Sequence, residues 1–398
     1  MKVITDSKKI KELLTRGVEE IIEEKSLLKK LRAGKPLRIK HGIDPTGPEI
    51  HIGRAVQFWK LRAFQELGHK IVLIIGDFTA QIGDASDKEA MRRPLSEKEV
   101  KENMRTYKSQ IGKILDMEKV ELRYNSEWLA QLKVKDILSL SMHFTAQQMI
   151  QRRNFKERWE KGKPIGLHEL DYPLLQGYDS VVVKADVEIG GSDQLFNLKI
   201  GREIQKIFGQ PPQDILTLKM LYGLDGRKMS TTWGNTITIP EKAEQMYGKI
   251  MSIKDELIPQ YFELCTNVPL KEIEKFKKEL RDQRVNPRDL KAKLAQEIVK
   301  LYWGEKRART VAVEFSKVFQ EKKLPSQIKK VEIEEKKICL LDLLVKTKLA
   351  TSKSEAKRLI LQGGVKINGK REQNWQKIVK IKKGQILQVG KRKFVKVG

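Results

Sequence analysis

The pattern of residues 37–79 constrains the fold of this chain most strongly. Residues 37–43 (LRIKHGI) and 71–79 (IVLIIGDFT) are apolar runs rich in β-branched residues and bounded by proline or glycine, which predicts two buried strands. Between them, apolar residues recur at helical spacing from 56 to 67, and Gly68 stands where a helix would end. Strand, helix and strand in this order form a βαβ unit, which requires a parallel sheet. We therefore predict an α/β fold with a Rossmann-like, doubly wound parallel sheet.

Polar residues follow the first of these strands, where parallel sheets bind their ligands. Asp44 and Thr46 lie after the strand, His51 opens the helix, and Gly53 lies in its first turn. Ligands bind at the carboxyl ends of parallel strands, close to helix N-termini whose free N–H groups attract phosphate. A histidine at a helix start is more often a cap or a packed ring, but here it can donate to phosphate, and the glycine leaves room for adenine. The position predicts a nucleotide site.

The charge balance points to a polyanionic partner. The chain has 80 Lys and Arg against 52 Asp and Glu, a net charge of +28. Neutralising phosphates with basic side chains dominates affinity for nucleic acid, although a lysine-rich proteome would also raise the charge. Residues 351–398 decide between these readings, because they carry 14 Lys or Arg and only two acids, Glu355 and Glu372. The excess in this segment predicts nucleic-acid binding there.

The composition also indicates where the chain works. No run of about 18 apolar residues occurs, so we predict no membrane span. Residues 1–17 lack the apolar region of a signal peptide and predict an amphipathic helix. Cys265 and Cys339 are far apart and show no CxxC spacing, so neither a disulfide framework nor a cysteine-built zinc site is predicted. These features fit a cytoplasmic protein.

Changes of pattern along the chain predict its domains. Residues 1–238 contain the parallel-sheet pattern, and residues 239–325 turn wholly helical. Residues 326–337 are charged and weakly apolar, which predicts a linker. Residues 338–398 combine two short helices with several short strands, which predicts a small α+β domain.

Three segments of the first domain carry more specific expectations. Ser96 with Glu99 three residues on predicts a helix that begins with a capping box. The apolar run at 181–189 (VVVKADVEI) predicts a strand. The basic run at 151–163 (QRRNFKERWEKGK) is interpreted as a solvated helix face that touches RNA.

Six short motifs occur along the chain in an order that is specific to one protein family. HIGR resembles the His-Ile-Gly-His signature of the class I aminoacyl-tRNA synthetases, and KMSTT resembles their Lys-Met-Ser-Lys-Ser loop. Together with four further motifs, they are similar over residues 1–398 to the bacterial tyrosyl-tRNA synthetases. In chain order the motifs are GIDPT (42–46), HIGR (51–54), IGD (82–84), YxxxQxxD (172–179), GGSDQ (190–194) and KMSTT (228–232). Residues 352–370 (SKSEAKRLILQGGVKINGK) resemble the S4 RNA-binding module.

The resemblance implies a binding site for L-tyrosine in the first domain. Asp179 would accept the phenolic O–H, Gln194 would face the carboxylate, and the α-ammonium would be held by Asp44, Asp84, Tyr172 and Gln176. Without the family, a zwitterion also needs carboxylates for its ammonium. The i, i+4, i+7 spacing of Tyr172, Gln176 and Asp179 puts these three on one helix face. The plain alternative for Asp179 is an ion pair with a nearby lysine.

The resemblance also implies the residues that bind ATP and act on its phosphates. Gly53 would lie against adenine, Asp193 against the ribose, and Thr46 and His51 against the phosphates. Lys88 and Arg92 would help with pyrophosphate and the tRNA end. The remaining predicted ATP-site residues are Gly42, Gly191, Lys228, Met229 and Ser230.

Three residues depart from the family pattern. Arg54 replaces the second histidine of the signature, which places a guanidinium at the phosphate contact. Thr231 replaces the second lysine of the loop and removes a cation from the pyrophosphate side. Lys40 stands where a phenol-reading tyrosine is common, and it would either donate to the phenolic oxygen or pair with Asp179.

The predicted reaction is in-line attack of the tyrosine carboxylate on the α-phosphorus of ATP, followed by transfer of the tyrosyl group to the 3′ end of tRNA(Tyr). Positioning and electrostatic stabilisation suffice for it, with no protein nucleophile. The implied partners are tRNA(Tyr), L-tyrosine and ATP with Mg²⁺, and a homodimer is implied as well. No metal site built from protein ligands is predicted. The alternatives are a tryptophanyl enzyme and a catalytically weak paralogue that acts as an RNA-binding or splicing protein, which Arg54 and Thr231 keep open.

Overall fold

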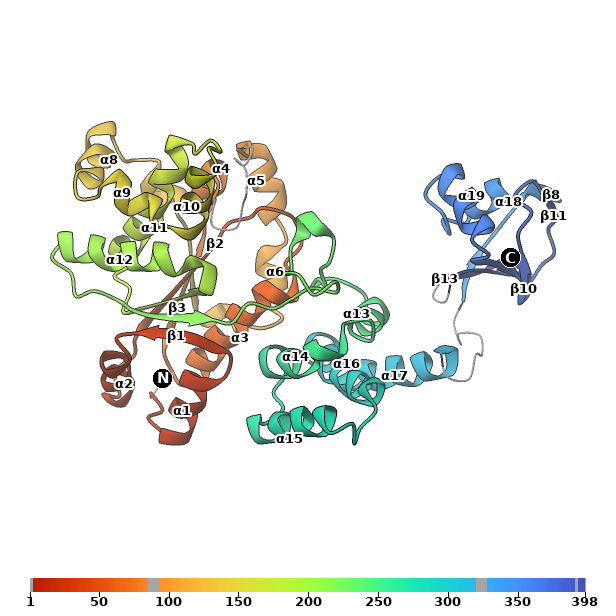
Figure 1. The fold of residues 1–398 in the computed structure, drawn as a ribbon, viewed down its shortest axis with the longest axis horizontal. Helices are drawn as coiled ribbons and strands as arrows, with labels where there is room; N and C mark the ends of the chain where they lie inside the picture. The colour runs from red at the N-terminus through yellow and green to blue at the C-terminus, as the bar shows by residue number, and fades with distance from the viewer. Residues whose placement is uncertain (1–2, 85–93, 320–327, 391–392, 398) are drawn as a thin grey trace. The chain divides into compact units, whose positions relative to one another are not determined.

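The computed structural model describes residues 3–84, 94–319, 328–390 and 393–397, and Figure 1 shows its helices and strands. The chain forms two compact units, one ending at Ala308 and one beginning at Arg309. Among the described residues, no helix is both long and apolar enough to cross a membrane.

The first unit is built on a six-stranded sheet. Its spatial order is β1 (Val18–Ile22), β6 (Asp214–Leu218), β5 (Val187–Gly191), β2 (Arg38–Ile43), β3 (Lys70–Ile75) and β4 (Val120–Tyr124). Every pair is parallel except β1 with β6. The predicted doubly wound parallel sheet is confirmed, while the antiparallel edge strand β1 was not predicted. The chain order reverses between β2 and β5, and this topological switch point is where such sheets bind ligands.

Helices cover the sheet and connect its strands (Figure 1). They are α1 (Ser7–Thr15), α2 (Glu24–Arg32), α3 (Ile52–Glu66), α4 (Thr79–Ile82), α5 (Glu97–Met104), α6 (Tyr107–Ile111), α7 (Ser126–Leu129), α8 (Val134–Ser141), α9 (Ala146–Ile150), α10 (Arg153–Glu160), α11 (Leu167–Val182) and α12 (Leu195–Ile207). The predicted capping box of Ser96 and Glu99 is present at the start of α5. The connection β2–α3–β3 between parallel strands places the N-terminus of α3 at the carboxyl edge of the sheet.

The strand predicted at 181–189 is wrong over its first six residues. Helix α11 continues to Val182, and β5 begins only at Val187. Between them Lys184 adopts a positive φ of 50°, which turns the chain. A short apolar run fits a buried helix end as well as a buried strand, and Val181 and Val183 are indeed buried. The hydrophobic pattern therefore could not locate this boundary.

The wholly helical pattern predicted after residue 239 is present as α13 (Ala243–Ile250), α14 (Ile258–Cys265), α15 (Leu270–Arg281), α16 (Pro287–Trp303) and α17 (Glu305–Phe319). Helix α16 begins with Asn286 as its N-cap and Pro287 in its first turn. It is tied to α3 by a hydrogen bond of 3.0 Å from Trp59 Nε1 to the Tyr302 hydroxyl. Residues 239–308 thus belong to the same compact unit as the sheet.

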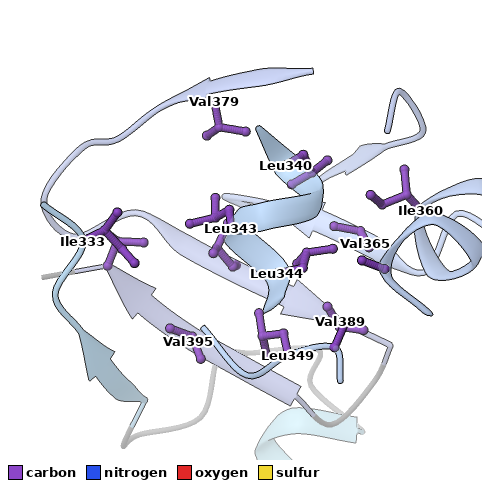
Figure 2. Packing of buried hydrophobic residues seen from close by; sticks show 14 residues of the cluster. Ile333, Leu340, Leu343, Leu344, Leu349, Ile360, Val365, Val379, Val389 and Val395 are labelled. Atoms are coloured by element: carbon purple, nitrogen blue, oxygen red, sulfur yellow. The ribbon is translucent and has the colours of Figure 1, made fainter. Parts of the chain in front are cut away.

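The second unit has a core of its own. Its elements are β7 (Lys329–Val331), β8 (Lys337–Cys339), α18 (Leu340–Lys346), α19 (Lys353–Leu361), β9 (Val365–Ile367), β10 (Lys370–Glu372), β11 (Ile378–Lys380), β12 (Ile386–Val389) and β13 (Lys393–Val397). The strands form one sheet in the order β10-β9-β12-β13-β7 and a pair β11-β8. Figure 2 shows Leu340, Leu343 and Leu344 of α18 packed among Val365, Val389 and other apolar side chains.

Part of the segment predicted as a linker belongs to this second unit. Strand β7 pairs in parallel with β13, so that Val331 lies opposite Val397. Ile333 is 9% exposed and packs in the same core (Figure 2). A strand of three residues at the sheet edge buries few side chains, so a mostly charged segment can form it. Its place in the sheet depends on partners more than sixty residues later in the chain.

Candidate active site

One pocket opens at the carboxyl ends of β2 and β5, beside the N-terminus of α3. Lys88 and Arg92 lie outside the described residues, and Lys40 lies beneath the pocket. Every other predicted site residue lines it: Gly42, Asp44, Thr46, His51, Gly53, Arg54, Asp84, Tyr172, Gln176, Asp179, Gly191, Asp193, Gln194, Lys228, Met229, Ser230 and Thr231. The structure therefore brings together residues that are spread over nearly 190 positions of the chain.

Asp44 is held between two hydroxyl groups. Thr79 Oγ1 donates to its Oδ1 at 2.8 Å, and the Tyr172 hydroxyl donates to its Oδ2 at 3.0 Å. Burial raises the pKa of Asp44 to about 6, although both hydrogen bonds lower it. Asp44 is therefore an ionised acceptor at neutral pH and takes up a proton in mildly acidic solution.

Asp179 lies deeper and is only 3% exposed. Trp128 Nε1 donates to its Oδ1 at 2.8 Å, and Asn125 Nδ2 approaches its Oδ2 at 3.4 Å. Burial raises the pKa of Asp179 to about 7, against the lowering effect of the Lys40 ammonium and of the two donors. Sequence reasoning missed Asn125 and Trp128, although Asn125 directly follows β4 and the strand-end rule could have found it.

Lys40 differs from both of its predicted alternatives. It is fully buried, and its ammonium lies 2.8 Å from Glu188 Oε1 in an ion pair. It also donates to the carbonyl oxygen of Gln176 at 2.9 Å and to Ser180 Oγ at 2.7 Å. An ammonium has three donors, and all three are used. Lys40 therefore neither donates into the pocket nor forms an ion pair with Asp179, because Glu188 on the neighbouring strand takes its charge.

Asp84 is neutralised by an arginine from the basic run at 151–163. Arg152 Nη2 donates to Asp84 Oδ1 at 2.6 Å, and Gln194 Nε2 donates to Oδ2 at 2.7 Å. Arg152 is 4% exposed, and Arg158 in the same run is 2% exposed and paired with Glu169 at 2.8 Å. The interpretation of this run as a solvated face is therefore wrong for these two arginines. Composition alone cannot tell a buried ion pair from a solvated charge.

The start of α3 combines a neutral imidazole with a guanidinium. His51 Nδ1 accepts the backbone N–H of Arg54 at 3.3 Å, which leaves Nε2 to carry the proton as a donor. Burial, together with the charges of Arg54 and Lys228, lowers the pKa of His51 to about 3. Arg54 donates to Thr46 Oγ1 at 2.9 Å and to the Asp44 carbonyl oxygen at 3.1 Å. This edge can bind an anion through donors that do not titrate near neutral pH.

Gly53, in the first turn of α3, lies against the motif at 228–232. A Cβ atom on Gly53 would lie 3.0 Å from His51 Nδ1 and 3.4 Å from Met229 Cβ, so a side chain there would crowd the pocket. Lys228 Nζ lies 2.9 Å from Asp193 Oδ2. The backbone N–H of Ser230 donates to Asn235 Oδ1 at 2.8 Å, which ties the motif to the residues after it.

His41 also lines the pocket, and sequence reasoning missed it. Its Nδ1 lies 2.8 Å from the Ile189 carbonyl oxygen and must donate to it, so the imidazole has its acceptor at Nε2. Burial lowers the pKa of His41 to about 4, so the ring is neutral in the physiological range. Its position beside Gly42 at the end of β2 was the available signal.

The pocket therefore has two chemical halves. One half is lined by carboxylates, amides and a tyrosine hydroxyl, which suit an ammonium group and a hydroxyl donor. The other half combines Arg54, Lys228 and the N-terminus of α3, which suit phosphate. Among the described residues, no group of three or more His, Cys, Asp and Glu side chains could hold a metal ion.

Two family models match this chain and together span most of it. The family described as tRNA synthetases class I (W and Y) matches residues 32–320. The tyrosine–tRNA ligase SYY-like C-terminal domain matches residues 319–397. The tyrosine–tRNA ligase of Thermotoga maritima is 46% identical over 386 residues, which cover 97% of this chain and 96% of that protein. The tyrosine–tRNA ligase of Aquifex aeolicus is 45% identical over 386 residues, with 97% of each covered.

Solved structures share the fold of the larger unit. A C-terminally truncated mitochondrial tyrosyl-tRNA synthetase of Aspergillus nidulans superposes with a TM-score of 0.63 at 22% identity, over 78% of this chain and 94% of that one. The tyrosyl-tRNA synthetase of Archaeoglobus fulgidus complexed with L-tyrosine gives 0.62 at 22%, over 77% and 99%. A tryptophanyl-tRNA synthetase of Encephalitozoon cuniculi gives 0.59 at 15%, over 77% and 91%. At these identities the likeness concerns the fold alone.

Proposed function

Because this chain belongs to the class I tyrosyl-tRNA synthetases, the tyrosine–tRNA ligases, we propose that its pocket activates L-tyrosine with ATP and then transfers the tyrosyl group to the 3′ end of tRNA(Tyr). The carboxylate of tyrosine attacks the α-phosphorus, tyrosyl-adenylate forms, and pyrophosphate leaves. No protein nucleophile is required, so the side chains of the pocket act by binding, orienting and stabilising charge.

Asp179 carries the assignment of the amino acid. It is a buried carboxylate at the inner end of the pocket, and Trp128 Nε1 fixes one of its oxygens at 2.8 Å. A phenolic hydroxyl that reaches this depth satisfies the carboxylate as a donor. A phenylalanine side chain would leave the buried acceptor without one, at a cost of about 1–3 kcal/mol or more. Asp179 therefore reads the group that distinguishes tyrosine from phenylalanine.

The charged end of tyrosine faces the polar residues nearer the sheet edge. Asp44 and the Tyr172 hydroxyl, which lie 3.0 Å apart, support a site for the α-ammonium. Gln176 contributes to the same site, and Gln194 offers an amide N–H to the α-carboxylate. Asp84 helps mainly through Gln194, because Arg152 already neutralises it.

ATP takes the half of the pocket that Arg54 and the 228–232 motif line. His51 and Thr46 would face the phosphates, Gly53 would face adenine, and Asp193 the ribose. Lys228 is paired with Asp193 at 2.9 Å, so binding of ATP exchanges this ion pair for one contact to the ribose and one to pyrophosphate. Mg²⁺ would enter on the phosphates of ATP, since it keeps most of its water and few protein ligands at such sites. Once bound, it would screen the charge of the leaving pyrophosphate.

Two partners follow from the rest of the molecule. The C-terminal unit, with its excess of Lys and Arg, would bind tRNA, and the enzyme would work in the cytoplasm. A second copy of the chain would cover helix α8, where Val134, Leu138 and the C-cap residue Met142 recur at helical spacing. These side chains are 75%, 59% and 84% exposed. Replacing Leu138 by Arg should shift a dimer to the monomer in sedimentation analysis.

The test of the function is ATP–pyrophosphate exchange with each of the twenty amino acids. Tyrosine alone should support rapid exchange. Replacing Asp179 by Ala should lower exchange with tyrosine far more than with phenylalanine, so that the ratio of the two falls towards one. Exchange with tryptophan, or with no amino acid at all, would contradict the proposal, as would unchanged discrimination in the Asp179→Ala variant.

A further inference from the structure

Asn197 lies outside the pocket but contacts two residues that line it. It belongs to the second half-turn of α12, three residues after Gln194, and its side chain is fully buried. Its Nδ2 donates to Gln176 Oε1 at 2.9 Å and to Gln194 Oε1 at 3.0 Å. One amide nitrogen therefore holds the carbonyl oxygens of two glutamines that come from different helices.

The other end of each glutamine is held by a carboxylate. Gln194 Nε2 donates to Asp84 Oδ2 at 2.7 Å, and Gln176 Nε2 donates to Glu188 Oε1 at 3.3 Å. A carboxylate accepts only from the N–H end of an amide, and the Nδ2 group of Asn197 donates only to the oxygen end. Each glutamine is thus fixed in one of its two amide orientations by partners at both ends.

Asn197 itself does not satisfy its own acceptor in this arrangement. Its Oδ1 is buried and has no hydrogen-bond partner among the described residues. A buried acceptor without a donor costs free energy, and a core amide with a purely structural role is normally satisfied. Turning the amide around would not relieve this cost, because Oδ1 would then face two carbonyl oxygens. Asn197 Oδ1 therefore stays without a donor, while Nδ2 forms hydrogen bonds to both glutamines.

We propose that Asn197 is a positioning residue for the amino-acid substrate. It makes Gln176 present an oxygen lone pair to the α-ammonium and Gln194 present an N–H to the α-carboxylate. This inference rests on the proposed function, in which those two glutamines bind the charged end of tyrosine. Asn197 acts only through them and touches neither the substrate nor ATP.

The first test replaces Asn197 by Leu, which has the same branched arrangement of heavy atoms and no polar atom. The KM for tyrosine in ATP–pyrophosphate exchange should rise about tenfold or more, since both glutamines lose their anchor, while the KM for ATP stays unchanged. The melting temperature should change little, because the unsatisfied Oδ1 is removed while Gln176 Oε1 and Gln194 Oε1, which line the open pocket, exchange the Asn197 donor for water. Gln210→Leu is the control: it removes an amide that donates to the Val181 carbonyl oxygen at 3.0 Å, after the end of α12, and should leave both KM values unchanged.

The second test separates the two glutamines. Tyramine keeps the ammonium of tyrosine, and 3-(4-hydroxyphenyl)propionate keeps the carboxylate, so each competitive inhibitor depends on one of them. In Asn197→Asp the new acceptor faces the carbonyl oxygens of both glutamines. Gln176 should turn more readily than Gln194, because its bond to Glu188 is 3.3 Å long, whereas Gln194 is held to Asp84 at 2.7 Å. The inhibition constants of the two compounds should therefore rise unequally, and their ratio should change about fivefold or more.

Several outcomes would overturn the inference. They are an unchanged KM for tyrosine in Asn197→Leu, an equal rise in the KM values for tyrosine and ATP, or an equal loss of both inhibitors together with a lower melting temperature. The wild-type enzyme serves as the reference. If it fails to activate tyrosine, the proposed function is wrong, whereas an active wild type with an indifferent Asn197→Leu variant contradicts only the role of Asn197.

Discussion

At the scale of single residues, burial sets the charge state of the acids and bases in the pocket. It raises the pKa of Asp44 to about 6 and that of Asp179 to about 7. It lowers the pKa of His41 to about 4 and that of His51 to about 3. The two histidines therefore remain neutral across the physiological range, and the two carboxylates are the groups that titrate close to neutral pH.

These values predict how tyrosine activation depends on pH. In the free enzyme a raised pKa means that the neutral acid persists to higher pH, so each carboxylate is lost as an anion when the pH falls through its folded value. The kcat/KM for tyrosine should fall in two steps, at about pH 7 as Asp179 takes up a proton and at about pH 6 as Asp44 does. Asp44→Asn should have a lower kcat/KM and keep only the step at the higher pH. A profile that is flat from pH 5 to 8 in the wild type would contradict both assignments.

The ion pair of Lys40 with Glu188 predicts a stability effect. Replacing Lys40 by Met leaves a buried carboxylate without its counter-charge, which should lower the free energy of unfolding by about 3–5 kcal/mol in urea denaturation. The double variant Lys40→Met with Glu188→Gln should recover part of this loss, because the uncompensated charge is gone. A Lys40→Met enzyme of full stability that fails only with tyrosine would instead make Lys40 a donor to the phenol.

At the scale of elements, the pocket depends on how α11, α3 and the 228–232 motif meet at the sheet edge. Helix α11 presents Tyr172, Gln176 and Asp179 to the pocket, as their i, i+4, i+7 spacing predicts. The motif at 228–232 contributes Lys228, whose ammonium is paired with Asp193. Thr231 also lines the pocket but carries no charge.

We therefore predict that the rate of tyrosine activation depends strongly on Lys228. In Lys228→Ala the rate of activation should fall by about 10²-fold or more, the scale for losing one preorganised group at a developing charge. Thr231→Lys should raise the rate or leave it unchanged. Arg227→Ala is the matched control, because Arg227 is largely exposed and paired with Asp225 at 2.6 Å. Pre-steady-state formation of tyrosyl-adenylate measures all three, and a Lys228→Ala variant as fast as the wild type would refute the assignment.

At the scale of the whole molecule, the chain has two compact units with separate cores. The apolar cluster of the second unit is made from residues after 330. Strand β7 belongs to the sheet of the second unit. A deletion that removes the described strands of this unit completely therefore has to begin before Lys329. The pocket is lined wholly by residues of the first unit.

Removal of residues 328–398 should therefore leave tyrosine activation nearly intact. It should weaken the binding of tRNA and reduce the salt dependence of that binding, because the basic side chains of the second unit are lost. A milder variant is Leu343→Ala, which opens a cavity at a fully buried position of the second core and costs about 2–5 kcal/mol there. It should impair aminoacylation and spare ATP–pyrophosphate exchange. Loss of exchange with unchanged affinity for tRNA would overturn this division of labour.

The sequence by itself determined the fold class, the helical region after 239 and the two helices of the last domain. Through the resemblance of its motifs to a known family, it also indicated most of the residues that line the pocket. Hydrophobic periodicity is local, and the rule that ligands bind at the carboxyl ends of parallel strands needs only the order of the elements. Where that information was ambiguous, the predictions were wrong. The apolar run at 181–189 suited a helix end as well as a strand, and the charged segment around Val331 hid an edge strand.

Only the tertiary structure decided which polar groups are partners. Lys40 pairs with Glu188 because β2 and β5 are neighbours in the sheet, and Arg152 reaches Asp84 across 68 positions of the chain. No periodicity in the sequence indicates such pairs, since a lysine or arginine looks the same there whether it is solvated by water or paired with a carboxylate. The orientation of Gln176 and Gln194 by Asn197 is of the same kind. It depends on a hydrogen-bond geometry that exists only after α11 and α12 have packed side by side.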